Sequence, residues 1–78
     1  GYSNGDELIR AFAERLRQIV PADMQVGRIG VGEFAILYSD APSSERVDAF
    51  VNRLLDQMTK PYRLVTHLQS VNLSIGIV

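Results

Sequence analysis

Apolar residues recur every three to four positions in two stretches of the chain. The first stretch covers residues 4 to 20, and the second follows a loop at residues 40 to 44 and reaches about Thr59. This spacing places the apolar side chains on one face of a helix, so the sequence predicts two amphipathic helices. Asn4 and Glu7 have the spacing of a capping box at the start of the first helix, and Pro21 ends it.

The other apolar residues alternate with polar ones or form short runs, as in β-strands. They predict four strands, at residues 25 to 29, 33 to 39, 62 to 67 and 70 to 78. Glycines between the first two strands allow a hairpin turn, because glycine readily adopts a positive φ. The second strand is apolar on both faces, which predicts a central, covered strand. The last strand is apolar on one face and small on the other, which predicts a helix packed on the small face.

The order helix, hairpin, helix, hairpin predicts an α+β fold, with two helices packed on a mixed, largely antiparallel sheet. The 78 residues are enough for at most one small domain. The chain starts without Met and ends inside an apolar run, so we expect a fragment. Its apolar runs are far shorter than the roughly 18 residues of a membrane span, so we expect no membrane contact from this segment.

Charge and cysteine content narrow the functional classes. The 8 Lys and Arg against 9 Asp and Glu give a net charge of −1, and the basic residues are scattered. This distribution predicts no nucleic-acid partner. The absence of cysteine excludes disulfides, thiolate metal ligands and cysteine nucleophiles. It is also compatible with a reducing compartment, and we expect a cytoplasmic location.

Two familiar catalytic patterns are not supported. Ser39, Asp40 and His67 could be combined into a triad on paper, but no strand-turn-helix element presents the serine. We therefore predict that His67 is a turn or surface residue. The glycines between residues 27 and 32 have the look of a phosphate loop, but no Lys-Ser/Thr pair follows them.

Three segments together resemble the motifs of one family. Gly1 to Leu8 resembles the Gly-His-x-x-Gly-Asp-x-Leu segment that starts a helix in GGDEF domains, the diguanylate cyclase family. Arg28 to Leu37 resembles the family's signature hairpin, Arg-x-Gly-Gly-Asp/Glu-Glu-Phe followed by an apolar strand. Val71 to Ile77 resembles its Thr-x-Ser-Ile-Gly strand. The three matches occur in family order and cover essentially the whole chain.

The resemblance implies a palm-like α/β fold related to nucleotidyl cyclases. Residues 1–78 would form the central part of a single GGDEF-like domain, with its first strand and helix and its C-terminal elements absent from this sequence. Members of the family condense two GTP molecules into cyclic di-GMP, and divalent cations held by acidic residues neutralise the phosphates.

The signature hairpin departs from the family pattern at two positions. Gly32 stands where the family has a metal-binding acid, and glycine offers no carboxylate. The resemblance therefore implies that the family's Mg²⁺ binds weakly or not at all, and we predict no metal ligand. Val31 stands where the family has a glycine close to the nucleotide. Its side chain would block that approach, with an added penalty if the position needs a positive φ.

The resemblance also assigns candidate site residues. Gly30, Val31 and Gly32 match nucleotide-binding positions, and Asp6 matches the acid that reads the guanine edge. An acid in the first helical turn would equally stabilise the helix end. Glu33 matches a catalytic acid and would be vestigial, or simply an exposed charge on the hairpin. The family's product-inhibition motif, Arg-x-x-Asp, would fall at residues 21 to 24 and is not there.

These departures favour a degenerate GGDEF domain of a cyclic di-GMP signalling protein. We expect it to be inactive as a cyclase and to act as a regulatory GTP-binding or dimerisation module. The partners that the resemblance implies are GTP or another guanine nucleotide, a second copy in a homodimer, and a neighbouring sensory or EAL phosphodiesterase domain. Two alternatives stay open: an active diguanylate cyclase that tolerates the altered signature, and an interaction module that binds no nucleotide.

Overall fold

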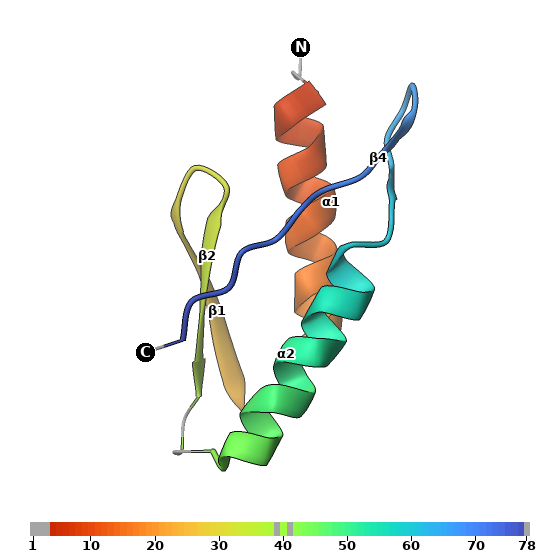
Figure 1. Ribbon diagram of the computed structural model, residues 1–78. Helices are drawn as coiled ribbons and strands as arrows, with labels where there is room; N and C mark the ends of the chain where they lie inside the picture. The colour runs from red at the N-terminus through yellow and green to blue at the C-terminus, as the bar shows by residue number, and fades with distance from the viewer. Residues whose placement is uncertain (1–3, 39, 41, 78) are drawn as a thin grey trace.

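The computed structural model in Figure 1 describes residues 4–38, 40 and 42–77. The chain runs through α1 (Asn4–Ile19), β1 (Met24–Gly30), β2 (Glu33–Tyr38), α2 (Ser44–Met58), β3 (Tyr62–Arg63) and β4 (Leu68–Gln69). The β1–β2 hairpin stands beside the two helices, and the β3–β4 hairpin lies near the start of α1 (Figure 1). The α+β prediction is confirmed, and both helices end within one residue of their predicted ends.

The core lies where the apolar faces of the two helices meet. Leu16 and Ile19 of α1 are buried against Leu54 and Met58 of α2. Each burial of such a side chain contributes about 1.5 to 3 kcal/mol, so this cluster is the main attraction between the helices. Ser43 caps α2, since its side chain accepts a hydrogen bond from the backbone N–H of Arg46 at 3.2 Å.

The β1–β2 hairpin is antiparallel, with Val26 opposite Ile36 and Arg28 opposite Phe34. Its apolar side chains on the helix side pack on the core, where the rings of Phe34 and Phe12 lie 5.2 Å apart. The register shifts between Arg28 and Gly30, so Ile29 is an extra residue that forms a β-bulge. The bulge twists the end of the hairpin that carries the turn.

The prediction that residues 33 to 39 form a central, covered strand is wrong for the residues that the structure describes. Within them, β2 pairs with β1 alone, and Leu37 on its outer face is 61% exposed. Ser39 lies outside the described residues. Apolar side chains on both faces indicate that a strand is suited to burial, but the covering elements must come from elsewhere.

The two last predicted strands also differ from the structure. Residues 62 to 67 do not form one strand, because β3 stops at Arg63 and the N–H of Leu64 donates to the carbonyl of His67 (2.9 Å), closing a turn. The segment from residue 70 to residue 77 forms no strand, since none of the described residues supplies a ladder partner. No described helix covers its small face either, and a Cβ on Gly76 would meet open space.

No helix within the described ranges is both long enough and apolar enough to cross a membrane.

Candidate functional site

Four of the predicted site residues meet at the turn between β1 and β2. Gly32 adopts φ +70°, a backbone conformation that favours glycine. Val31 does not have a positive φ, so the conformational penalty considered for this position does not arise. Its side chain is 90% exposed and projects from the turn. The turn therefore presents an isopropyl group to an approaching ligand, and no carboxylate at residue 32.

The charged side chains of Arg28 and Glu33 both lie close to Gly30. The Nε of Arg28 donates a hydrogen bond to the carbonyl oxygen of Gly30 at 3.1 Å. A Cβ built on Gly30 would lie only 3.2 Å from Oε2 of Glu33, so the glycine lets this carboxylate fold back over the turn. Glu33 itself is exposed, as expected for a hairpin charge.

A groove of about 430 Å³ separates the flank of α1 from β1. Its lining combines an apolar floor with charged side chains: Ile9, Ala13, Val26 and Phe34, with Gly27, and the charged Arg10, Glu14, Arg17 and Arg28. Three guanidinium groups against one carboxylate give the groove a positive balance. Guanidinium groups suit phosphate, and the apolar floor suits the face of a planar ring, so the groove has the chemistry for a nucleotide.

Asp6 lies apart from the hairpin, in the first turn of α1. It stands four residues before Arg10 and eleven before Arg17, so all three fall on one stripe of the helix. None of the five predicted site residues lines this groove, and Gly32 and Glu33 border instead the larger hollow beside β2 and α2. Gly1, Tyr2 and Ser3, the rest of the first motif, lie outside the described residues, as does the side chain of Asn4.

The hairpin turn does not suit a divalent cation. Glu33 offers one carboxylate there, and Gly32 offers none. Across the described parts of the chain, no group of three or more His, Cys, Asp or Glu side chains could hold a metal ion. Mg²⁺ needs carboxylate ligands to anchor it, so the donor set does not fit Mg²⁺.

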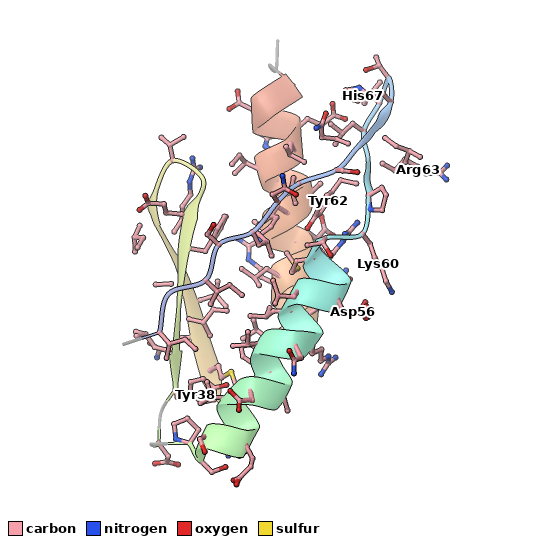
Figure 2. The ribbon with its side chains drawn as sticks, viewed as in Figure 1. Tyr38, Asp56, Lys60, Tyr62, Arg63 and His67 are labelled. Carbon is pink, nitrogen blue, oxygen red and sulfur yellow. The ribbon has the colours of Figure 1, made fainter. Side chains whose placement is uncertain are left out.

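A second cluster of contacts fixes α1 against the end of α2. The guanidinium of Arg15 lies 3.6 Å from the centre of the Tyr62 ring. It also donates to three carbonyl oxygens, those of Gln57 (3.1 Å), Lys60 (2.6 Å) and Pro61 (2.9 Å). The Tyr62 hydroxyl donates to the Met58 carbonyl at 2.6 Å, and burial raises the pKa of Tyr62 while Arg15 partly offsets this rise. Figure 2 shows Tyr62 beside α1, where the chain leaves the end of α2.

Sequence reasoning missed the arginines of the groove and the Arg15 cluster. Arg10 and Arg17 are seven residues apart on a helix, which is a signal for a shared face, but a polar helical face is usually only solvated. His67 was predicted correctly as an exposed turn residue. Its ring nitrogens lie near Thr66 Oγ1 (2.9 Å) and Gln69 Oε1 (3.1 Å).

Comparison with known proteins identifies relatives of the whole chain. The model of a family described as "Diguanylate cyclase, GGDEF domain" matches residues 1–78. The signaling protein YkoW of Bacillus subtilis is 31% identical over 78 residues, which are 99% of this chain and 10% of YkoW. The bifunctional diguanylate cyclase/cyclic di-GMP phosphodiesterase MucR of Pseudomonas aeruginosa is 33% identical over 79 residues, covering 99% of this chain and 11% of MucR. The chain thus spans about a tenth of the length of these relatives. No solved structure matches it.

Proposed function

Because the chain belongs to the GGDEF family of diguanylate cyclase domains, we propose that it binds a guanine nucleotide without cyclase activity of its own. In this proposal it serves as a regulatory or dimerising module of a cyclic di-GMP signalling protein. The observation that carries the proposal is the β1–β2 turn. There Gly32 removes a metal-binding carboxylate and the exposed Val31 occupies the space where the family brings a nucleotide close to the backbone.

Loss of the carboxylate acts on catalysis more than on binding. Attack of a ribose hydroxyl on a phosphate requires a metal to neutralise the charge that develops in the transition state. Binding of the nucleotide in the ground state depends less on a metal ion, since arginines can neutralise phosphate oxygens directly. Arg17 and Arg28 line the groove between α1 and β1 and would supply that charge. Asp6 would accept hydrogen bonds from the guanine edge.

We further propose that residues 1–78 are the central part of a larger domain. One edge of β2 has no partner among the described residues, and the segment 70–77 has no ladder partner there either. Between them and α2 lies a hollow of about 860 Å³, lined mainly by apolar side chains. An apolar strand preceding residue 1, as the family resemblance implies, would fill this space and complete the ladder.

The partners follow from the same family membership. We propose a homodimer and a neighbouring sensory or EAL phosphodiesterase domain, in a cytoplasmic protein. MucR is named a bifunctional diguanylate cyclase/cyclic di-GMP phosphodiesterase, which supports the second of these partners. A nucleotide bound to this domain could regulate its neighbour only if it binds one of two conformations more tightly.

Titration calorimetry of the full-length protein with GTP tests this proposal, in the presence of Mg²⁺ and again with the metal chelated. We expect binding in both conditions, no cyclic di-GMP formation, and loss of affinity in Asp6→Ala. The exposed acid Glu45, in the first turn of α2, provides the matched control Glu45→Ala, which should bind GTP normally. Absence of binding at millimolar GTP would contradict the proposal and favour an interaction module without a nucleotide.

The alternative of an active cyclase has one observation in its favour, the retained Glu33 with its carboxylate folded over the turn. Cyclic di-GMP formation by the wild-type protein, lost in Glu33→Ala, would establish this alternative. Under our proposal the wild type is silent, and the double substitution Val31→Gly with Gly32→Asp is the change that would restore metal binding and the space for the nucleotide.

A further inference from the structure

Residues 60 to 65, which we call the strap, leave the end of α2 and run back beside α1 towards its N-terminal half (Figure 1). The first part of the strap is firmly held. Arg15 binds the carbonyl oxygens of Lys60 and Pro61, and the Tyr62 side chain is 1% exposed. The ring of Tyr62 also lies 5.9 Å from that of Phe12. The strap is thus fixed to the middle of α1.

The far end of the strap is tied to α1 by a different residue. The backbone N–H of Val65 donates a hydrogen bond of 2.6 Å to Oε2 of Glu7. The sequence predicts a capping box between Glu7 and Asn4, whose side chain lies outside the described residues; the contact with Val65, 58 positions away, was not predicted. Leu64 and Val65 begin the turn between β3 and β4. The carbonyl oxygen of His67 closes this turn by accepting from the N–H of Leu64, and its ring contacts Thr66 and Gln69.

This contact bears on the end of α1 that carries Asp6. The first backbone N–H groups of a helix have no partner within the helix, so the first turn is its least constrained part. Glu7 lies in this first turn, directly after Asp6. Because the Glu7 carboxylate accepts a hydrogen bond from the backbone of an ordered turn, it restrains the helix backbone that carries Asp6.

We infer that Glu7 is a positioning residue for the nucleotide: by binding the N–H of Val65, it holds the first turn of α1 to the strap and so directs the Asp6 carboxylate. This inference rests on the proposed function, since Asp6 is the group that would read the guanine edge. The contact needs an acceptor at residue 7 and not a charge as such, so glutamine can replace glutamate while alanine cannot.

Two measurements on the full-length protein test the inference. The first is the affinity for GTP and for ATP of the wild type, Glu7→Ala, Glu7→Gln and the control Glu45→Ala. We expect Glu7→Ala to lower GTP affinity by about tenfold and to lower the preference for GTP over ATP, because ATP lacks the edge that Asp6 reads. Glu7→Gln should restore most of both, and Glu45→Ala should match the wild type.

The second measurement is amide hydrogen exchange without nucleotide. We expect Glu7→Ala to speed exchange at Val65 and in the first turn of α1, with no change in the core of α2. If the wild type binds no GTP, the proposed function fails, but exchange still decides whether Glu7 holds the first turn. Unchanged exchange in that turn, or an equal loss of GTP and ATP affinity, would overturn the inference.

Discussion

Apolar burial holds both hairpins to α1, with Tyr62 and Leu64 as the buried residues of the second, but the second is also tied to α1 by hydrogen bonds. The β1–β2 hairpin is held through apolar side chains, chiefly Phe34 packed on Phe12, and its turn projects freely with Val31 almost fully exposed. The β3–β4 hairpin has strands of only two residues, and two charged side chains of α1, Glu7 and Arg15, bind its backbone and that of the segment leading into it. Burial is non-directional, whereas hydrogen bonds fix a backbone at defined points.

This difference separates the roles of the two hairpins. The first presents predicted ligand-contacting residues on a turn that lies outside its apolar contacts with the helices. The replacement of the family's acid by Gly32 therefore alters the chemistry of the turn without removing the contacts that hold the hairpin. The second holds no predicted ligand contact, but its anchors reach both the middle and the first turn of α1. Substitutions in those anchors should disturb the fold or the placement of Asp6.

The largest effect is expected from Phe34→Ala, which removes the apolar anchor of the first hairpin. We expect the free energy of unfolding of the complete domain to fall by about 3 kcal/mol, the low end for a truncated aromatic because Phe34 is only half-buried. Denaturant titration measures this change. Ile29→Ala, at the exposed bulge of the same hairpin, is the control and should change stability by less than about 0.5 kcal/mol. Equal losses in the two variants would show that burial does not hold this hairpin.

The second prediction concerns Arg15→Ala, which removes three hydrogen bonds and the stacking on Tyr62. We expect a loss of about 2 kcal/mol, because carbonyl groups at the end of α2 lose a charged donor. Arg15→Lys should recover only part of this loss, since an ammonium group cannot reproduce the planar fork. The matched control is Arg53→Ala on the exposed face of α2. A full rescue by lysine would mean that charge alone, without directional bonding, anchors the strap.

The third prediction concerns the turn of the first hairpin. Gly32→Ala should lower the free energy of unfolding by about 1 kcal/mol, because an alanine is strained at φ +70°. Gly27→Ala in β1 is the control: a Cβ there meets nothing within 4 Å and φ is not positive. We expect it to be neutral or stabilising by about 0.5 kcal/mol. Thermal unfolding of both variants provides the comparison, and equal stabilities would contradict the φ argument.

Local pattern was enough to predict the helices and the first hairpin. The helical spacing of Leu16 and Ile19, and of Leu54 and Met58, depends only on residues that are close in the sequence. It can therefore be recognised without knowing which elements pack on the helix. The strand predicted at residues 70 to 78 does not form within the described residues 70 to 77. An alternating pattern shows that a segment can pair, but the ladder depends on a partner that no local pattern supplies.

The same difference between local and distant residues applies to the candidate site. Gly30 to Glu33 follow one another in the chain, so a family motif finds them together. The contact of Glu7 with Val65 spans 58 positions, and those of Arg15 with the end of α2 span more than 40. Contacts over such separations are decided by tertiary packing, which leaves no periodic trace in the sequence. The capping box predicted for Asn4 and Glu7 stays a prediction, and it gave no sign of the contact that Glu7 makes with Val65.

The smallest effect, and the sharpest test of the anchored hairpin, is the pH dependence carried by Tyr62. Burial raises its pKa above the ordinary value of 10.0, so the folded state holds the phenol proton more tightly than the unfolded state does. This contribution to stability is fully present below about pH 10 and is lost as the pH rises through the folded pKa. Wild-type stability should therefore fall more steeply between about pH 9 and 11 than that of Tyr62→Phe.

The Phe variant also loses the hydrogen bond to the Met58 carbonyl, which lowers its free energy of unfolding by about 1 kcal/mol at every pH. The informative quantity is therefore the slope of the free energy of unfolding against pH. Denaturant titrations of both proteins at a series of pH values give the two curves. Parallel curves for the wild type and Tyr62→Phe would mean that the phenol is solvated, and hence that the strap does not bury Tyr62 against α1.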